Sequence, residues 1–266
     1  MSPQRPLALI TGASSGIGKA LADNFAAAGY DVILSARSVP KMEAHAAELQ
    51  QRYSITTHVI AADLESATGA VELHAEIKRR GLTLTALVNN AGYGTFGEFK
   101  DATLESQLGM MQLNMMSLVT LAKLFLPDLL ANKGKMLNVA STASFQPGPY
   151  MAVYYATKAF VLNFSEALAA ELQHAGDGVT VTALCPGPTI SGFQDKADMH
   201  HSAMVKGRHL PTSEEVARKG FRAFQRGQRV YIPGWRNWLL AQLPRFGPRR
   251  LVTSIVIWVT GPVESE

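Results

Sequence analysis

The chain has 266 residues, of which 47% are hydrophobic and 17% are charged. This composition supports a buried core and excludes a chain that is mostly disordered. A single cysteine, Cys185, excludes a disulfide framework and a cysteine-ligated metal cluster within one chain. The formal net charge is +4, but the excess is local, because Glu214 and Glu215 are the only acidic residues between positions 205 and 250. No nucleic-acid partner is expected, since the basic residues form no recognisable reading motif.

The sequence shows no targeting or membrane-spanning segment. The first apolar run, Leu7–Ile10, is too short for the apolar part of a secretory signal. No run of about 18 apolar residues is present, so no membrane-spanning helix is expected. A single cysteine suits a reducing compartment, and we expect a cytoplasmic protein.

Short apolar runs alternate with helical patterns up to residue 232. In the first helical pattern Ile17, Leu21 and Phe25 recur at four-residue steps, which is the spacing of one helix face. The expected strands are Leu7–Thr11, Asp31–Ala36, His58–Ala62, Thr85–Asn89, Lys135–Ala140, Val179–Leu184 and Arg229–Ile232. The expected helices are Ile17–Ala28, Lys41–Tyr53, Ala67–Arg80, Leu104–Leu130 with one break, Met151–His174 and Ser213–Arg226.

This alternation predicts a single-domain, doubly wound α/β fold of the Rossmann type. About seven parallel strands would form one sheet with helices on both faces. We expect residues 1–234 to form the dinucleotide-binding and catalytic domain. Within it, residues 191–212 lack clear periodicity and are expected to form a lid over the site. Residues 235–266 no longer alternate and are expected to form a helical C-terminal extension.

The segment TGASSGIG, Thr11–Gly18, joins the first strand to the first helix. Its first glycine permits a tight turn, its second lets the backbone approach a pyrophosphate, and its third lets the helix pack close to the strand. The N-terminus of the helix offers free N–H groups and the positive end of its dipole to phosphates. The expected phosphate-binding residues are Gly12, Ser14, Ser15, Gly16, Ile17 and Gly18.

The residues after the second strand predict which nicotinamide cofactor binds. An acidic residue at this point would bind the ribose 2′-hydroxyl, but the chain has Ala36 followed by Arg37 and Ser38. A guanidinium suits a 2′-phosphate in charge and geometry, and the hydroxyls of Ser14 and Ser38 can add hydrogen bonds. The sequence therefore predicts NADP(H).

No metal is expected, because no acidic set accompanies the histidines between residues 200 and 209.

From Leu7 to Phe193 the motifs resemble the short-chain dehydrogenase/reductase family, and in particular its hydroxysteroid and long-chain 3-oxoacyl reductase members, which also carry an extension. The resemblance implies that Asp63 and Leu64 lie beside the adenine. It implies that a turn after the fourth strand closes the cofactor groove and that another after the sixth lies beside the nicotinamide. Thr189 or Ser191 would contact the carboxamide, and spacing slightly favours Ser191. The turn residues are Asn90, Ala91, Gly92, Pro186 and Gly187.

The same resemblance implies a catalytic set of Asn114, Ser141, Tyr154 and Lys158. Tyr154 and Lys158 are four residues apart and share a helix face, so the ammonium is expected to lower the tyrosine pKa. The phenol would exchange a proton with the substrate oxygen and bind the cofactor together with Lys158, while Ser141 would polarise a carbonyl. By resemblance, Asn114 would hold a proton-relaying water. Tyr155 is a weaker candidate, because no lysine follows it by four residues.

The extension combines tryptophan, arginine and a late apolar run, Leu251–Thr260. We expect a buried helix or strand there, packed within the chain or between subunits, in preference to contact with a membrane surface. Phe193–Leu210 and the residues around the expected site suggest an apolar pocket. The aromatic and apolar candidates for its wall are Phe96, Phe99, Phe145, Pro147, Tyr150 and Met151.

Together these features predict an NADP(H)-dependent enzyme that interconverts a hydrophobic ketone and its secondary alcohol. The alternative is a sensor or scaffold protein that binds the same cofactor without turnover. The intact set of catalytic residue types favours the enzyme. The resemblance makes a homodimer or homotetramer the expected assembly.

Overall fold

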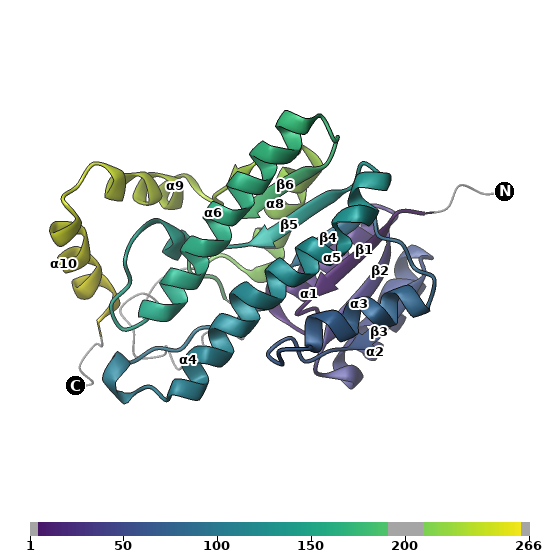
Figure 1. The fold of residues 1–266 in the computed structure, drawn as a ribbon, viewed down its shortest axis with the longest axis horizontal. Helices are drawn as coiled ribbons and strands as arrows, with labels where there is room; N and C mark the ends of the chain where they lie inside the picture. The colour runs from purple at the N-terminus through teal and green to yellow at the C-terminus, as the bar shows by residue number, and fades with distance from the viewer. Residues whose placement is uncertain (1–4, 191–209, 262–266) are drawn as a thin grey trace.

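The computed structural model describes residues 5–190 and 210–261, which form one parallel sheet covered by helices (Figure 1). The seven strands lie in the order β3-β2-β1-β4-β5-β6-β7, which is the doubly wound arrangement that the sequence predicts. Each expected strand is present, with its ends shifted by at most one residue. The strands are β1 (Leu7–Thr11), β2 (Asp31–Ala36), β3 (Thr57–Ala61), β4 (Ala86–Asn89), β5 (Lys135–Val139), β6 (Thr180–Leu184) and β7 (Val230–Tyr231).

The helices cover both faces of the sheet, so the central strands are buried on both sides. The expected helical regions are confirmed. Their bounds are α1 (Gly16–Ala27), α2 (Val39–Tyr53), α3 (Gly69–Arg79), α4 (Leu104–Met111), α5 (Ser117–Ala131), α6 (Ala152–Ala175) and α8 (Ser213–Gln225). In β1, Ala8 and Ile10 face the core beneath α1, α2 and α8, whereas Leu7 and Leu9 face the core beneath α3, α5 and α6.

The expected break in the long helical region is a π-helical turn. This turn, η2 (Gln112–Met116), lies between α4 and α5, and π-turns inside α-helices frequently occur at functional sites. By length and composition alone, Leu104–Ala131 is apolar enough to cross a membrane, contrary to the expectation that no such segment exists. In the fold α5 packs against α3 and β4, as a core helix does.

The C-terminal extension is helical, as expected, but its late apolar run is not buried in the chain. After α9 (Trp235–Gln242) and the short turn η4 (Leu243–Arg245), the run lies in α10 (Arg249–Thr260), at the edge of the molecule (Figure 1). Of the residues in α10, only Val256 and Thr260 are buried. The expected burial is therefore wrong for the single chain, because α9 and α10 project beyond the sheet instead of covering it.

The topology reverses between β1 and β4, where chain connections leave in opposite directions. In such sheets ligands bind at the carboxyl ends of the strands beside this reversal. The TGASSGIG turn follows β1, the turn containing Asn90 follows β4, and Ser141 follows β5. The fold thus brings the motifs of the sequence to one edge of the sheet.

Candidate active site

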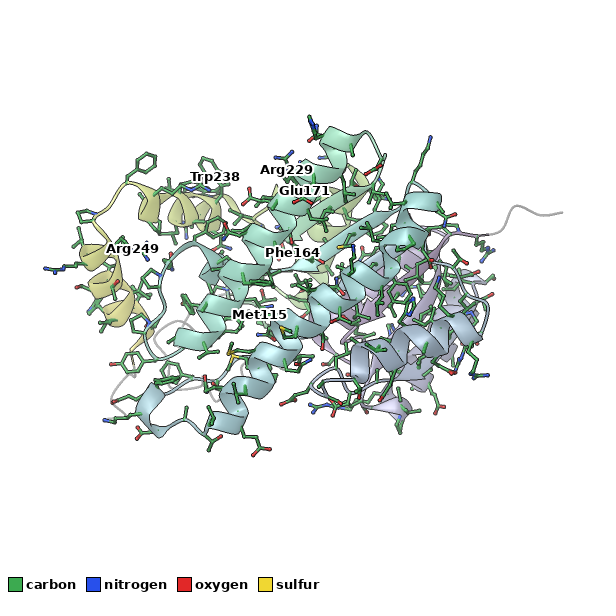
Figure 2. The ribbon with its side chains drawn as sticks, viewed as in Figure 1. Met115, Phe164, Glu171, Arg229, Trp238 and Arg249 are labelled. Carbon is green, nitrogen blue, oxygen red and sulfur yellow. The ribbon has the colours of Figure 1, made fainter. Side chains whose placement is uncertain are left out.

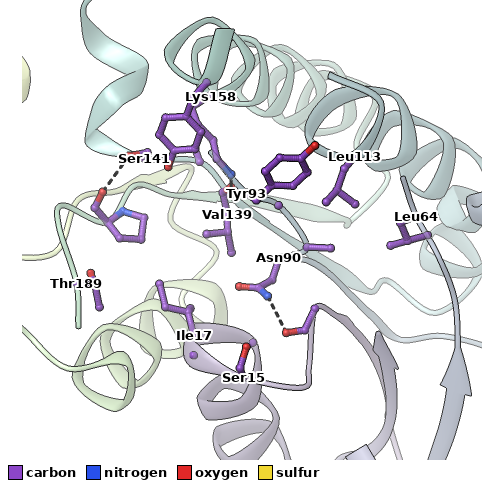
Figure 3. Close-up of a pocket in the computed structure, with 18 of the residues that line it drawn as sticks. Ser15, Ile17, Leu64, Asn90, Tyr93, Leu113, Val139, Ser141, Lys158 and Thr189 are labelled. Atoms are coloured by element: carbon purple, nitrogen blue, oxygen red, sulfur yellow. Dashed lines mark hydrogen bonds between the residues drawn. The ribbon is translucent and has the colours of Figure 1, made fainter. Parts of the chain in front are cut away.

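A pocket of about 660 Å³ lies at the carboxyl ends of the strands (Figure 3). It collects nearly all the residues that the sequence predicts for the site, although they come from positions 12 to 189. Two predicted residues are exceptions, since Asn114 lies behind the wall and Ser191 is outside the described residues. The predicted residues that line the pocket are Gly12, Ser14, Ser15, Gly16, Ile17, Gly18, Arg37, Ser38, Asp63, Leu64, Asn90, Ala91, Gly92, Ser141, Tyr154, Lys158, Pro186, Gly187 and Thr189.

The turn after β1 has the backbone of a phosphate cradle. Gly12 has φ +66° and Gly16 has φ +55°, a region that side chains disfavour. A Cβ on Gly18 would collide with the Gly12 carbonyl and the Asn90 amide, so close packing of helix on strand requires glycine there. The first residues of α1 line the pocket, and their N–H groups have no acceptor inside the helix, since the Ser15 side chain makes no capping bond. These features fit a pyrophosphate.

Thr11 and Asn90 hold this turn against the end of β4. The Asn90 side chain donates a hydrogen bond to the Thr11 carbonyl at 2.9 Å. The Thr11 hydroxyl accepts from the backbone N–H groups of Asn90 and Ala91, both at 3.0 Å. Thr11 is not among the site residues predicted from the sequence. A hydroxyl residue at the end of a buried strand is the signal that could have revealed it.

The corner expected to receive the 2′-phosphate contains two more charged residues than predicted. Lys41, on the first turns of α2, lines the pocket together with Arg37 and Ser38. Glu65 lines it as well, and its carboxylate lies 3.5 Å from the Arg37 guanidinium. The Tyr93 hydroxyl donates a second hydrogen bond to Glu65 at 3.0 Å. Burial, and to a smaller extent this hydrogen bond, raises the pKa of Tyr93 to about 12.

Ser141 and Lys158 lie on the wall opposite the cradle (Figure 3), and Tyr154 lines the same pocket. Ser141, at the end of β5, accepts a hydrogen bond from the Ala143 N–H at 3.1 Å and donates one to the Pro186 carbonyl at 3.4 Å. Lys158 is buried, and its Nζ donates to the Val139 carbonyl at 2.8 Å. Its Nζ lies 5.9 Å from the centre of the Tyr154 ring, so the two residues share one face of α6 as their spacing predicts.

The expected lowering of the Tyr154 pKa is wrong for this arrangement. Burial raises the pKa of Tyr154, and its hydrogen bond with Ser141 opposes this only in part. Burial also lowers the pKa of Lys158 to about 8. The physical reason is that both groups are removed from water, which disfavours the phenolate and the ammonium alike. Tyr154 is therefore a phenol at neutral pH, and so a proton donor.

Asn114 does not reach the pocket surface but anchors the elements around it. Its amide nitrogen donates to the Tyr93 carbonyl at 2.9 Å and to the Thr157 hydroxyl at 3.0 Å, and its oxygen accepts from the Tyr93 N–H at 3.1 Å. It lies in the π-turn η2. A Cβ on Gly92 would lie 2.8 Å from the Asn114 oxygen and 3.4 Å from Lys158 Nζ. Gly92 thus leaves room for both side chains.

Tyr155 also lines the pocket, but its ring has a packing role. A Cβ on Gly148 would collide with the Tyr155 ring, which therefore lies flat on that backbone. Burial raises the pKa of Tyr155 to about 12.

Among the apolar residues expected on the substrate side, Met151 lines the pocket and Phe96 packs beside it, whereas Phe99 is exposed.

The turn after β6 completes the described part of the pocket. Thr189 is buried, and its hydroxyl donates to the Gly187 carbonyl at 2.8 Å. Its predicted competitor Ser191 and most of the predicted lid, residues 191–209, lie outside the described residues. Ile190 pairs with Thr212 across that gap.

Over residues 5–190 and 210–261, no group of three or more His, Cys, Asp or Glu side chains could hold a metal ion.

Comparison with known proteins places this site in a family. A model of the short chain dehydrogenases matches residues 6–201. The very-long-chain 3-oxoacyl-CoA reductase-B of Danio rerio is 33% identical over 186 residues, which is 67% of this chain but only 58% of the relative. A short-chain dehydrogenase from Sphingobium yanoikuyae, solved in complex with NADPH, superimposes with a TM-score of 0.80 at 30% identity, covering 91% of this chain and 94% of that one.

A second solved structure has the same sequence identity and a slightly lower TM-score. The bulky-bulky ketone specific alcohol dehydrogenase from Comamonas testosteroni has a TM-score of 0.76 at 30% identity, with 91% of this chain and 92% of that chain covered. The matched region contains the whole sheet up to β6 and every described residue of the pocket. The chain therefore belongs to the short-chain dehydrogenase family of oxidoreductases.

Proposed function

We propose that this protein is an NADP(H)-dependent enzyme that interconverts a hydrophobic ketone and its secondary alcohol. The observation that carries this proposal is the meeting of Ser141, Tyr154 and Lys158 in the same pocket as the glycine turn after β1. A proton donor and a phosphate cradle thus line the same cavity, which is the arrangement that carbonyl reduction by a nicotinamide cofactor requires.

The residues divide the chemistry among them. When bound, NADP(H) supplies or accepts the hydride. Tyr154, held as a phenol by burial, gives its proton to the ketone oxygen during reduction, and in the reverse direction its phenolate takes the proton from the alcohol. Ser141 donates a hydrogen bond to the same oxygen and stabilises the charge that develops there. Lys158, when protonated, stabilises the phenolate that Tyr154 leaves behind.

The proposal assigns the 2′-phosphate to Arg37, with Ser38 and Lys41 beside it. Support comes from the charge of this corner and from related structures that were solved with NADPH, among them the L-sorbose reductase of Gluconobacter frateurii. Replacing Arg37 by Asp should weaken NADPH binding strongly and improve the relative use of NADH. An unchanged ratio of kcat/KM for the two cofactors would contradict the assignment.

The substrate class rests on the apolar part of the pocket wall and on the relatives. Val139, Ala143, Met151 and Tyr155 line the pocket next to Tyr154. The names of two relatives refer to bulky ketones and to very-long-chain 3-oxoacyl substrates. We therefore expect bulky or long-chain ketones to be reduced in preference to polar sugars or phosphorylated carbonyls.

A panel of such ketones with NADPH, followed by the absorbance of the reduced nicotinamide, tests the enzyme directly. Tyr154→Phe should abolish turnover while NADPH still binds. A protein that binds NADPH tightly but reduces none of the panel, with or without Tyr154, would instead support the non-catalytic sensor.

The assembly and the location complete the proposal. A homodimer or homotetramer is supported by an exposed stripe on α4, where Leu104, Leu108 and Met111 follow one another at helical spacing. Analytical ultracentrifugation of the full chain would test it.

The buried free thiol of Cys185 suits a reducing compartment, and this supports a cytoplasmic location. Fractionation of the source cells would test that location.

A further inference from the structure

The two tail helices, α9 and α10, expose an apolar surface that no other described part of the chain covers. We define the tail surface as the exposed side chains of residues 235–258 (Figure 2, where Trp238 and Arg249 mark it). Phe246 is 86% exposed and Trp258 is 83% exposed, although aromatic residues are usually buried. The large exposed members are Trp235, Trp238, Leu239, Leu240, Leu243, Phe246, Leu251, Ile255, Ile257 and Trp258.

The exposure on α10 follows the period of a helix. Leu251, Ile255 and Trp258, at positions i, i+4 and i+7, are exposed together, while Val256 and Thr260 on the opposite side are buried. An outward apolar stripe of this kind is typical of a surface that contacts a membrane or another molecule.

The aromatic composition of the tail is that of a membrane interface. The chain has three tryptophans, Trp235, Trp238 and Trp258, and all three belong to the tail surface. Arg236 lies over the Trp235 ring, with its guanidinium carbon 5.4 Å from the ring centre. Tryptophan prefers the boundary between headgroups and acyl chains, because its ring is apolar and its N–H is polar.

The charge of this region distinguishes a lipid surface from a second copy of the chain. The sequence has no Asp or Glu between Glu215 and Glu264. The tail carries Arg236, Arg245, Arg249 and Arg250. Two tail surfaces meeting about a two-fold axis would bring arginines together without acidic partners, whereas anionic headgroups would neutralise them.

The tail surface is also tied to the rim of the candidate active site. Asn237 of α9 lies against the Gly187 backbone, at 2.7 Å from the position that a Gly187 Cβ would occupy. The Thr260 hydroxyl of α10, which donates to the Val256 carbonyl at 2.7 Å, also lies 3.4 Å from the Pro149 carbonyl, two residues before the pocket residue Met151. A surface that binds at the tail would therefore lie beside the substrate side of the pocket.

We propose that the tail surface binds the protein peripherally to membranes with anionic lipids, with the tryptophans at the level of the headgroups. This inference is independent of the reaction, because it rests on the tail alone. The binding is reversible and weakens with salt, since part of it comes from the arginines.

The three tryptophans make a direct test possible, because the intrinsic tryptophan fluorescence of the native chain reports on the tail alone. We expect vesicles of phosphatidylglycerol and phosphatidylcholine to shift the emission to the blue, and lipids brominated near the headgroup to quench it. Co-sedimentation with these vesicles should exceed that with pure phosphatidylcholine, and added salt should reduce it.

Matched variants separate the apolar and the charge contributions. Arg249→Glu with Arg250→Glu should lower the vesicle partition coefficient by at least about tenfold, while Lys123→Glu, at an exposed position of α5, leaves it unchanged. Leu251→Asn with Ile255→Asn should lower it similarly, and Val71→Asn on α3 serves as its control. All four side chains changed in the tail are exposed, and circular dichroism verifies that each variant is folded.

Two results would overturn the proposal. The first is an emission spectrum that anionic vesicles do not change. The second is tryptophan emission already shielded from acrylamide in vesicle-free protein, together with a dimer mass that falls to a monomer in the Leu251→Asn, Ile255→Asn variant. That second result would identify a second copy of the chain as the partner of the tail. Ketone reduction in detergent-free buffer is unaffected by either result, so the proposed function is tested separately.

Discussion

The carboxylate of Glu65 lies 3.5 Å from the guanidinium of Arg37, the side chain that we assign to the 2′-phosphate. Glu65 is held in place from its other side, where the Tyr93 hydroxyl donates to it at 3.0 Å. A phosphate arriving at this corner meets a cation that already has an anionic neighbour. Because the Arg37 side chain is 64% exposed, this ion pair contributes about 1 kcal/mol at most.

Replacing Glu65 by Gln should tighten NADPH binding. The change removes a negative charge near the phosphate and frees Arg37, while the amide oxygen can still accept from Tyr93. We expect the Kd for NADPH to fall about threefold and the Kd for NADH to stay the same, as measured by nicotinamide fluorescence. Glu72→Gln, an exposed carboxylate on α3, is the control. Weaker NADPH binding in Glu65→Gln would mean that Glu65 positions Arg37 productively.

Lys41 should contribute to the recognition of NADPH as a second cation. It lines the pocket beside Arg37 and Ser38, and an ammonium binds phosphate as a point charge. In Lys41→Ala we expect the Kd for NADPH to rise about fivefold, which corresponds to roughly 1 kcal/mol for an exposed pair. Lys19→Ala, which removes an exposed lysine of α1 outside the pocket, should have no effect. An equal loss for NADH would show that Lys41 does not read the 2′-phosphate.

The strands and the glycine turn could be predicted from the sequence because their signals are local. The predicted bounds of β2, Asp31–Ala36, are those of the structure, since a buried parallel strand is a continuous apolar run between polar residues. Tyr154 and Lys158 could be paired from their spacing on one helix. In such cases the neighbours in space are also neighbours along the chain.

Contacts between distant segments could not be predicted in this way. Glu65 reaches Arg37 across 28 residues, and no periodic pattern reports that approach. The pKa of Tyr154 was misjudged because spacing reveals the nearby lysine but not the burial that outweighs its charge. The exposure of α10 was missed because an apolar helix that faces outward has the same sequence pattern as one that faces a core.

Burial of Lys158 should lower the free energy of unfolding of the native protein. Its pKa is lowered to about 8 from 10.5, so below pH 8 the native state holds a desolvated ammonium that is hydrated in the unfolded chain. Lys158→Met removes a penalty of roughly 3 kcal/mol, offset by about 1 kcal/mol for the hydrogen bond to Val139. We expect the variant to be inactive but about 2 kcal/mol more stable at pH 7, by urea unfolding.

The pH dependence gives that prediction a definite sign. Between pH 8 and 10.5 the unfolded chain binds more protons at this site than the native state, so the stability of the native protein rises with pH relative to the variant. The difference in the free energy of unfolding between Lys158→Met and the native protein should therefore shrink over that range. A difference that grows with pH would contradict a lowered Lys158 pKa.

The same titration should appear in the reaction. Tyr154 remains a phenol across the neutral range because burial raises its pKa, whereas Lys158 loses its charge near pH 8. We expect kcat/KM for ketone reduction to be constant near neutral pH and to fall above about pH 8, because the phenolate formed on Tyr154 is then no longer stabilised. In Lys158→Arg any remaining activity should lack this decline, since a guanidinium stays charged.

Gly92 should be required for the geometry around Lys158 and Asn114. A Cβ at Gly92 would lie 2.8 Å from the Asn114 oxygen and 3.4 Å from Lys158 Nζ, and Asn114 is fixed by its bonds to Tyr93 and Thr157. In Gly92→Ala we expect Asn114 to move, with a loss of about 1 kcal/mol of stability and at least a tenfold loss of kcat. If the two residues act together, the double variant with Asn114→Ala will be no slower than Asn114→Ala alone. Additive losses of kcat would show that Gly92 acts on the site by a separate route.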